Sequence, residues 1–366
     1  MPESVDVAVV GGGPAGAAAA ISLCRHTPLR VAVLEASAYD GPRVGETLSP
    51  SIQGLLSYLG VWEAFAAQGH LPAFGTAAAW GGADLAEHSF LFTGRGEGWH
   101  VDRGRFDRML AEAVAGAGGW LGTGLRVVGC AREGRGPWRL SWRGQSGGGT
   151  LGARFLIEAS GQRGTLGRIL GAVPDVCDRL LGIVGFVAGR DAAEGSAGAL
   201  VEAVPDGWWY AAALPSGRAV AALMTDAGAA RALGTGGRLS AWWDLLAATR
   251  HVRRVLEAAG PPAALHVRPA YSRLLRPLGG PGWVAAGDAA ASFDPLSSMG
   301  VGHALHSGIH AARVACDQLM GDGRLLRAFE DAVEAHFARY LELRRLHYRL
   351  EQRWVDRPFW AARHRG

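Results

Sequence analysis

The stretch VDVAVVGGGPAGAAAAISL, residues 5–23, contains the pattern that decides the fold. A short β-branched run leads into Gly11, Gly13 and Gly16 in GxGxxG spacing, and an alanine-rich segment follows. The first glycine allows a tight turn, the second lets a pyrophosphate approach the backbone, and the third lets the helix pack on the strand. The next apolar run, RVAVLEAS, contains Glu35, whose carboxylate is placed to take ribose hydroxyls. This order predicts an α/β, Rossmann-like fold with a dinucleotide at the helix N-terminus.

A second stretch, GDAAASFDPLSSMGVGHAL from Gly287, indicates which dinucleotide is bound. Asp288 follows a strand-like run and can accept a hydrogen bond from a sugar or ribityl hydroxyl. Pro295 fixes the loop, and Gly300 and Gly302 open an apolar helix whose positive end would stabilise negative charge on a reduced flavin. We therefore expect FAD rather than NAD. The alternative is an ordinary strand, turn and helix with a capping aspartate.

The composition narrows the class of protein. The 366 residues are 49% hydrophobic with a formal charge of +4, and no lysine occurs. Since no basic run is interleaved with stacking aromatics, we expect no nucleic-acid partner. The apolar segment 5–24 contains Asp6, glycines and a proline, so we expect no transmembrane segment and a cytoplasmic location. We expect no metal site, and we expect these cysteines to be buried thiols: Cys24, Cys130, Cys177 and Cys316.

Three further segments carry a resemblance to a known superfamily: RVGETLSPS from Arg43, VDRGRFDRML from Val101 and FLIEASGQRG from Phe155. With the two glycine-containing stretches, they make most of the chain similar to the FAD-dependent monooxygenase superfamily of aromatic hydroxylases and flavin-dependent halogenases. The resemblance implies a glutathione-reductase-type FAD domain with an inserted β-sheet substrate domain and a C-terminal helix. It also implies that the loop from Arg43 lies beside the flavin and that Arg103 contacts it.

The motifs and this resemblance together define the predicted site and domains. The predicted cofactor-binding residues are Gly11, Gly13, Gly16, Glu35, Arg43, Arg103, Asp288, Pro295, Gly300, Val301 and Gly302. The predicted FAD domain comprises residues 1–75, 100–165 and 271–325. The predicted substrate domain comprises residues 76–99 and 166–270, and a C-terminal helical segment covers residues 326–366.

A narrower resemblance rests on GWWYAAALPSGR from Gly207, LMTD from Leu223 and the ending LHYRLEQRWVDRPFWAARH. These segments resemble the maturation flavoproteins of lysine ε-oxidase, glycine oxidase and quinohemoprotein amine dehydrogenase, which modify a tryptophan of a precursor protein. The resemblance implies hydroxylation of an electron-rich aromatic ring through a C4a-hydroperoxyflavin, with O2 as oxidant and NAD(P)H or a flavin reductase as electron source. A tryptophan of a partner protein is one candidate substrate. The alternatives are a small-molecule natural-product hydroxylase, a reductase of isoprenoid double bonds, and a non-catalytic flavoprotein chaperone.

Halogenation competes with hydroxylation, and two departures from the halogenase pattern weigh against it. That pattern needs a catalytic lysine, and the chain has none. Arginine is a poor replacement because its guanidinium stays protonated. The WxWxIP signature of halogenases would fall on Tyr210, Ala212 and Leu214, so both of its tryptophans are replaced. We therefore expect no halogenase activity.

No catalytic dyad or triad is recognisable, so the catalytic assignments are few. Glu46 is the motif carboxylate nearest the expected flavin face, and it either tunes proton delivery or accepts loop N–H groups. His303 and His306 follow in the helix after the flavin loop, either as core histidines or as a proton shuttle. The aromatic and serine residues of the predicted substrate cavity have packing and loop-capping as alternative roles. They are Trp208, Trp209, Tyr210, Ser297 and Ser298.

The middle of the chain, residues 166–270, alternates strand-like runs with glycine and proline turns. This alternation predicts a sheet that covers the flavin. Just before it, the glycine-rich run QSGGGT, residues 145–150, predicts the tip of a hairpin.

The C-terminal periodicity predicts one long helix from Leu325 that Pro358 ends. Its predicted apolar face comprises Phe329, Val333, Phe337, Leu341, Leu346, Leu350 and Trp354. Its predicted solvated face comprises Arg344, Arg345, Arg349 and Arg353. Arginine and aromatic residues are typical of protein interfaces, so a tryptophan-bearing precursor protein is predicted to dock here. The aromatic residues concerned are Tyr348, Trp354, Phe359 and Trp360.

Overall fold

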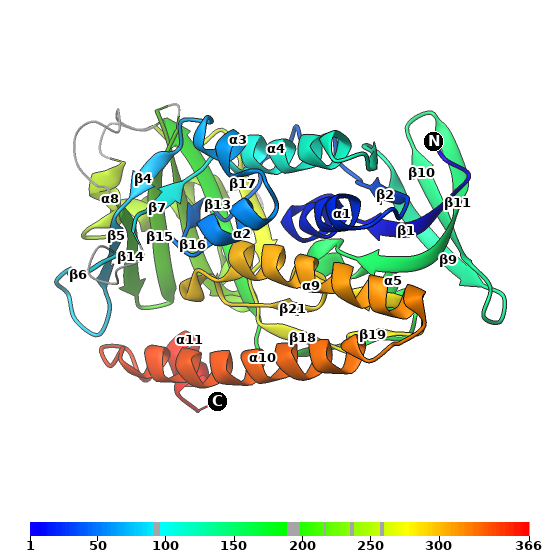
Figure 1. Cartoon of the computed structure of the whole chain (residues 1–366). Coiled ribbons are helices and arrows are strands. Elements are labelled where there is room, and N and C mark those ends of the chain that lie inside the picture. The colour runs from blue at the N-terminus through cyan, green and yellow to red at the C-terminus, as the bar shows by residue number, and fades with distance from the viewer. Residues whose placement is uncertain (91–95, 189–197, 216, 235–237, 257–259, 366) are drawn as a thin grey trace.

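The computed structural model has an α/β fold in which two large β-sheets lie beside each other and long helices pack along them (Figure 1). The structure describes residues 1–90, 96–188, 198–215, 217–234, 238–256 and 260–365. The N-terminal strand lies inside the first sheet, and the C-terminal helices reach the second sheet (Figure 1). The predicted α/β class with a Rossmann-like parallel core is therefore confirmed.

The first sheet has eight strands and a parallel core. Six of them, in spatial order, are β19 (Gly279–Gly280), β20 (Trp283–Ala285), β11 (Gly147–Glu158), β1 (Ser4–Val10), β2 (Val31–Leu34) and β8 (Trp120–Gly122). From β11 the sheet continues, antiparallel, through β10 (Trp138–Gly144) to β9 (Arg126–Arg132). The β10–β11 pair confirms the predicted hairpin, but its tip is only residues 145–146, because residues 147–150 already pair with β10 as part of β11. β2 is buried along its whole length, which is why it reads as an unbroken apolar run.

Two helices of this sheet matter most for the site. α1 (Pro14–His26) joins β1 to β2 and packs on α9 (Gly300–Met320). A Cβ on Gly308 would overlap the carbonyl oxygen of Ala15, so the two helices are in direct backbone contact. The other helical segments near this sheet are α2 (Ile52–Tyr58), α3 (Trp62–Ala66), α4 (Arg103–Gly116), η2 (Gly161–Arg163), α5 (Thr165–Ile169), η3 (Gly287–Ala289) and η4 (Pro295–Ser297).

The second sheet has seven strands and two differently covered faces. In spatial order they are β17 (Leu265–Pro269), β13 (Leu180–Ala188), β16 (Arg218–Asp226), β15 (Gly207–Leu214), β14 (Gly198–Val204), β5 (Gly75–Ala79) and β6 (Ala86–Ser89). One face packs on a cluster that includes Trp242 and Leu246. These residues come from the helical region of α6 (Ala227–Ala232), α7 (Arg238–Ala247) and α8 (Val252–Val255). The opposite face meets the C-terminal aromatics and the cavity described below.

Two small sheets connect these parts. One contains β3 (Thr47–Leu48), β7 (Gly98–His100) and β4 (Leu71–Ala73), and the other contains β12 (Val173–Val176), β18 (Arg273–Arg276) and β21 (Ala291–Ser292). The predicted division of the chain into three parts stays a prediction. Strands β5 and β6 do lie in the same sheet as β13 to β17, as an inserted substrate domain requires.

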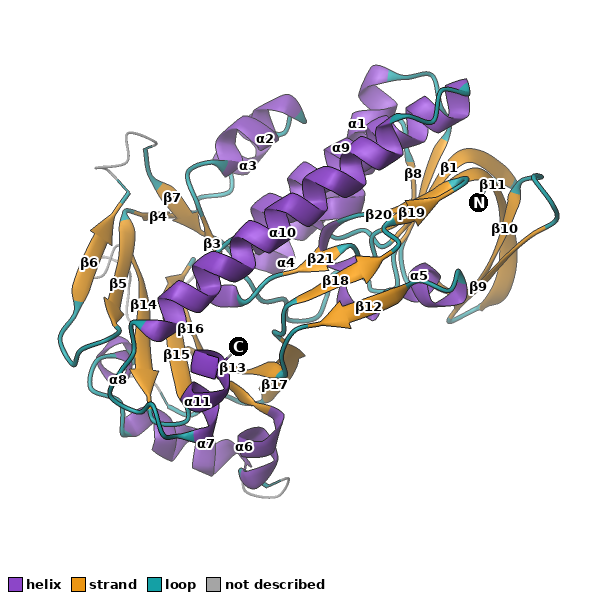
Figure 2. Ribbon diagram, turned by 90° about the horizontal axis from the view of Figure 1, so that it is seen from below, coloured by secondary structure: helices purple, strands orange, loops and turns teal. Residues whose placement is uncertain are grey.

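The C-terminal segment differs from the predicted single helix. α10 (Leu325–Arg349) crosses the molecule to the second sheet and ends at Arg349, and a separate helix, α11 (Pro358–Arg365), follows (Figure 2). Pro358 therefore begins a helix instead of ending one, because a proline at the first helical position loses no hydrogen bond.

The faces of α10 also differ from the prediction. Leu346 and Leu350 are each 60% exposed, whereas Tyr340 and Tyr348 are buried. With 3.6 residues per turn, position 346 lies away from the buried face that begins at Phe329, and Leu350 follows the end of α10. Arg344 is not solvated either, since it forms ion pairs with two aspartates.

The C-terminal aromatics are unavailable as interface residues. Tyr348, Phe359 and Trp360 are 1%, 4% and 0% exposed and pack in the protein's own core, with Trp354 partly buried beside them. The expected burial of the four thiols is not complete: Cys24, Cys130 and Cys316 are partly buried, and Cys177 is exposed, because it lies in the connection after the exposed edge of β12. No helix among the described residues has the length and apolarity needed to cross a membrane.

Candidate functional site

A cavity of about 1060 Å³ runs from the turn between β1 and α1 to the inner face of the second sheet. Its lining comes from segments far apart in sequence, which meet between the two sheets. We call the part around the β1–α1 turn the dinucleotide end. We call the opposite part the substrate chamber, and its lining includes Val184, Val201, Trp208, Tyr210, Ala222, Met224, His347 and Leu350.

Glycines shape the dinucleotide end. Gly11 has a φ of 104°, and a Cβ there would overlap the carbonyl oxygen of Ala159. A Cβ on Gly16 would overlap the carbonyl oxygen of Gly11. Gly13 has open space where its Cβ would stand, and no side chain caps the first turn of α1. The arrangement leaves backbone N–H groups and room for an anion at the helix N-terminus.

Glu35 lies at the wall of this end, as predicted from its position after β2. Its Oε2 accepts a 2.7 Å hydrogen bond from the N–H of Gly12, and its Oε1 accepts one from the N–H of Ser37 at 2.9 Å. The carboxylate therefore also fixes the glycine turn, a role that the sequence analysis did not assign.

Arg43 and Arg103 line the cavity next to each other because one buried carboxylate binds both. Asp107 Oδ2 lies 2.8 Å from Arg43 Nη1, and Asp107 Oδ1 lies 3.1 Å from Arg103 Nε. Arg103 also donates to the carbonyl of Val44. Sequence reasoning missed Asp107, although its spacing of four residues from Arg103 in α4 was an available signal.

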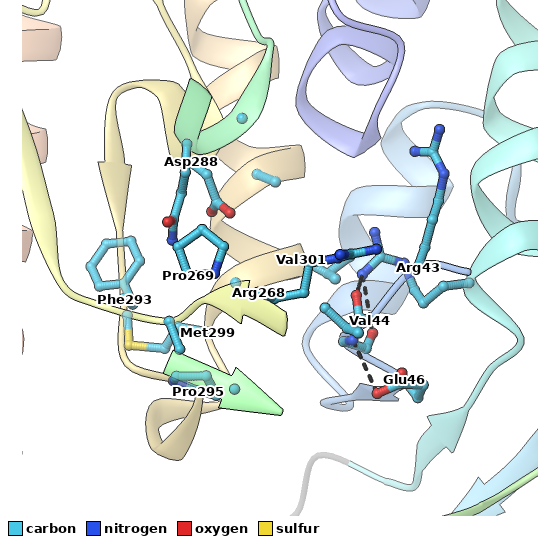
Figure 3. A pocket seen from close by; sticks show the side chains of 18 of the residues that line it. Arg43, Val44, Glu46, Arg268, Pro269, Asp288, Phe293, Pro295, Met299 and Val301 are labelled. Atoms are coloured by element: carbon cyan, nitrogen blue, oxygen red, sulfur yellow. Dashed lines mark hydrogen bonds between the residues drawn. The ribbon is translucent and has the colours of Figure 1, made fainter. Parts of the chain in front are cut away.

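Asp288 lines the middle of the cavity, on the wall opposite Val44 and Glu46 (Figure 3). Burial raises the pKa of its carboxyl to about 6, while Arg103 and Arg273 act in the lowering direction. Of the other predicted cofactor residues, Pro295, Gly300 and Val301 line the cavity.

Gly302 does not line the cavity, unlike its neighbours Gly300 and Val301, because the turn of α9 carries it away from the wall. Arg268 of β17 lines the cavity near Val301 (Figure 3), and no motif pointed to it. Its guanidinium adds positive charge to a cavity whose lining already includes Arg103.

The substrate chamber contains only some of the predicted residues. Trp208 and Tyr210 line it, but Trp209 points to the other face of β15 and packs on Trp242, with ring centroids 5.1 Å apart. Successive residues of a strand point to opposite faces, so all three could not share one wall. Ser298 lines the cavity, whereas the Oγ of Ser297 donates to the carbonyl of Asp294 at 2.8 Å and caps the loop.

Glu46 lines the cavity, and one of its carboxylate oxygens has no hydrogen-bond partner among the described residues. It is 4% exposed, and its Oε2 accepts the N–H of Gly45 at 3.0 Å. Its Oε1 is buried and has no hydrogen-bond partner among the described residues. Burial raises the pKa of this carboxyl to about 7, with Arg103 opposing the shift. The site therefore holds a carboxyl group that changes charge near neutral pH.

A hydrogen-bond chain lies beside Glu46. The Oγ1 of Thr47 is 2.6 Å from Tyr210 Oη and 2.9 Å from His100 Nδ1. Burial lowers the pKa of His100 to about 4, so its ring is neutral, and its Nε2 lacks a partner in the described part of the chain. The direction of these two hydrogen bonds depends on which ring nitrogen of His100 carries the proton, because the hydroxyls of Thr47 and Tyr210 can each donate or accept.

His303 and His306, the two histidines of α9 considered above, do not line the cavity. The ring of His303 packs against Phe293 and His336, with centroid distances of 4.7 and 6.0 Å. Burial lowers the pKa of His303 to about 3, which leaves it uncharged. Its position fits a core histidine rather than a proton shuttle. The described residues include no group of three acidic, cysteine or histidine side chains placed to bind a metal ion.

The cavity fits an FAD molecule on the geometry above. The glycine turn leaves backbone and space for the pyrophosphate, Arg43 and Arg103 supply positive charge, and Asp288 supplies an acceptor farther along. No side chain caps the start of α9, so its first N–H groups also face this region.

Comparisons with known proteins agree with this site. Residues 4–198 match the family model described as an FAD binding domain. LodB of Marinomonas mediterranea, named as an FAD-dependent oxidoreductase, is 31% identical over 99% of this chain and 97% of its own length. A tryptophan 2-halogenase of Chondromyces crocatus is 27% identical over 99% of this chain and 71% of its own length.

Solved structures extend the likeness. The myxobacterial chondrochloren halogenase CndH has a TM-score of 0.90 at 25% identity, over 99% of this chain and 86% of its own. The peptidyl tryptophan dihydroxylase QhpG, essential for tryptophylquinone cofactor biogenesis, has a TM-score of 0.78 at 27% identity, over 98% of this chain and 78% of its own. The chain belongs to the FAD-binding domain family, within the superfamily of FAD-dependent monooxygenases and halogenases, and is an FAD-dependent oxidoreductase.

Proposed function

We propose that this protein is a monooxygenase that hydroxylates an electron-rich aromatic ring, and that the ring is a tryptophan side chain of a partner protein. One observation carries the proposal: the chamber has apolar and aromatic walls, and beside it Glu46 Oε1 is a buried acceptor without a partner among the described residues. An indole is an apolar ring with one N–H donor and no acceptor. Its shape and its hydrogen-bonding capacity therefore match the chamber.

The opening of the chamber supports a substrate attached to a protein. Leu350 lines the chamber and is also 60% exposed, and the exposed residues His347 and His88 line it as well. The chamber therefore opens to solvent between the end of α10 and β6. A side chain presented by another protein can enter there without that protein entering the cavity.

Bound FAD, once reduced by NAD(P)H or by a separate reductase, supplies the chemistry that activates O2 for attack on the ring. The protein's own residues supply the remainder. The apolar walls of the chamber exclude water from the reacting atoms. As a C–O bond forms, the O–O bond of the activated O2 breaks and its second oxygen atom leaves as water. The ring carbon then loses its proton, and the C–H electron pair returns to the ring. Glu46, in its carboxylate form, receives that proton.

Halogenation is the second candidate, because several relatives are named as halogenases. The complete absence of lysine argues against it, since no amine is present to hold or carry hypohalous acid. Guanidinium groups line the cavity, but they stay protonated and are poor nucleophiles.

The test is oxygen labelling. The FAD-loaded protein is supplied with NADPH, a flavin reductase and 18O2, with an unstructured tryptophan-containing peptide, free tryptophan or indole as substrate, and with bromide present. We expect 18O in the peptide, detected by mass spectrometry. Label only in free tryptophan or indole would indicate a small-molecule hydroxylase, and brominated product a halogenase. Oxidation of NADPH without labelled or brominated product in any substrate would overturn the proposal.

A further inference from the structure

Three residues on one face of α10 converge on Asp294. Tyr340, Arg344 and Tyr348 are spaced four residues apart, so they stand above one another on successive turns. The N–H of Asp294 donates to Tyr340 Oη at 2.8 Å. Arg344 Nε and Tyr348 Oη donate to Asp294 Oδ2 at 3.2 and 2.7 Å. Asp294 is only 1% exposed, so the helix holds this residue out of contact with water.

Asp294 controls the loop that forms one wall of the cavity. Its Oδ1 accepts the N–H of Leu296 at 3.0 Å and thereby caps η4. Phe293 precedes it and Pro295 follows it, and both line the cavity together with Met299 (Figure 3). The orientation of Asp294 therefore sets the path of this loop into the first turn of α9.

The same helix face also holds the wall of the substrate chamber. Trp208 Nε1 donates to Tyr348 Oη at 3.0 Å, and Tyr348 in turn donates to Asp294. Trp208 and Tyr348 are each 1% exposed. A buried chain of hydrogen bonds thus connects the indole in the chamber wall to the loop at the middle of the cavity. Each member fixes the orientation of the next, because a buried donor left without its acceptor is costly.

Arg344 adds a third attachment. Its Nη2 lies 3.0 Å from Asp178 Oδ2, just before β13 of the second sheet. The Oδ1 of Asp178 accepts the N–H of Leu180, the first residue of that strand, at 2.9 Å. One arginine of α10 therefore joins the second sheet to the loop at Asp294.

We propose that Tyr348 and Arg344 are positioning residues. Through Asp294 they hold the loop of Phe293 to Met299, and through Trp208 Tyr348 holds the chamber wall, so that the loop and the wall keep a fixed position relative to each other. α10 is then part of the active site, although neither side chain lines the cavity. The inference rests on FAD binding alone and does not require that the substrate be a tryptophan or that the reaction be hydroxylation.

The test compares Tyr348→Phe with Trp242→Phe. The first variant removes one hydroxyl from the chain of hydrogen bonds. The second removes a buried indole that donates to the carbonyl of Ile183 at 2.9 Å on the opposite face of the same sheet. We expect Tyr348→Phe to raise the Kd for FAD about 10-fold and to shift the visible absorption bands of bound flavin. Trp242→Phe should lower the Tm by at least as much and leave both flavin readouts unchanged.

A second variant, Trp208→Phe, removes only the N–H that begins the chain and keeps an aromatic ring in the wall. We expect it to shift the flavin bands in the same way, and we expect the double variant with Tyr348→Phe to add little, because both remove the same connection. Variants that lower the Tm but keep the FAD Kd within about twofold of the wild type, with unchanged absorption bands, would show that the contacts are structural only. The readouts need no turnover, so a failure of the proposed function would leave this result intact.

Discussion

The two ends of the cavity are built in different ways. At the dinucleotide end, backbone geometry and missing side chains make the site, and its glycines lie within six residues of one another. In the chamber, side chains make the site, and Glu46, Tyr210 and Leu350 come from widely separated parts of the chain. The first end recognises a cofactor shared by the whole family. The second can differ from relative to relative while the cofactor end stays the same.

The largest expected effect comes from the glycines at the dinucleotide end. Comparing two of them distinguishes a glycine that the fold requires from one that only the ligand requires. Gly11→Ala should abolish FAD binding, since its Cβ would overlap the carbonyl of Ala159 and its φ is 104°. Gly13→Ala should keep the wild-type Tm yet weaken FAD binding about 10-fold, because its open space is filled only by the pyrophosphate. Titration of flavin fluorescence measures the FAD affinity of both variants, and thermal unfolding measures their Tm.

Gly41→Ala is the matched control for this pair. Gly41 also has open space at its Cβ position but lies away from the cavity lining. It should change neither the Tm nor the Kd. A Gly13→Ala protein with wild-type FAD affinity would contradict the assignment of the glycine turn as the pyrophosphate site.

The next largest effect concerns Glu46 in the chamber. With a pKa of about 7, it is ionised only above neutral pH, so kcat should rise as the pH passes through 7. Glu46→Gln should lower kcat roughly 100-fold at high pH and remove this rise. A wild-type pH profile in the variant, at the wild-type rate, would eliminate Glu46 as the proton acceptor.

The same carboxyl predicts a pH effect on stability in the FAD-free protein. Its folded-state pKa of about 7 exceeds the value of about 4.3 expected on unfolding. Its contribution is therefore fully present below pH 4.3 and is lost as the pH rises through 7, by on the order of 3 kcal/mol. Between pH 5 and pH 8 the Tm of the wild type should fall relative to that of Glu46→Gln. Parallel Tm curves would contradict the shifted pKa.

The smallest effects come from neighbouring tryptophans on opposite faces of β15. Trp208→Phe should raise the KM for the aromatic substrate about fivefold, because it changes the chamber wall. It should also lower the free energy of unfolding, because it removes the buried hydrogen bond to Tyr348. Trp209→Phe should lower the free energy of unfolding by about 1 to 2 kcal/mol and leave KM unchanged, because it packs on Trp242. Steady-state kinetics and thermal unfolding on both variants distinguish the two faces.

The sequence predicted the dinucleotide end well because that end depends on residues near one another in the chain. The turn at Gly11, the strand before it and Glu35 after it require no knowledge of distant contacts. The chamber could not be predicted in this way. Alternation along β15 shows that Trp208 and Trp209 face opposite sides, but only the packing of α7 decides which side is which. The Thr47 to His100 contact likewise depends on the pairing of β3 with β7.

The C-terminal helix shows the same limit. The four-residue apolar spacing runs from Phe329 to Leu341, and the next apolar position predicted on that face is Leu346. In the helix, Leu346 faces outward and is 60% exposed. The arginine at 344 looked like a surface residue because its two aspartate partners, Asp178 and Asp294, come from separate loops. The number of charged residues in the sequence does not show which aspartates will pair with an arginine, because the fold brings them together.

The second sheet acts as a partition whose two faces pack in different clusters. Along β15, the residues at positions 208, 210 and 212 belong to one side, and those at 209 and 211 belong to the other. Substitutions can therefore accumulate on the chamber side and change which ring is accepted, while the helix-covered side keeps the strand in place. A randomised library restricted to alternate positions of β13, β15 and β16 would sample new substrates without sampling unfolded proteins. The two-residue period of the strands thus allows the chamber wall to change separately from the face that holds the sheet in place.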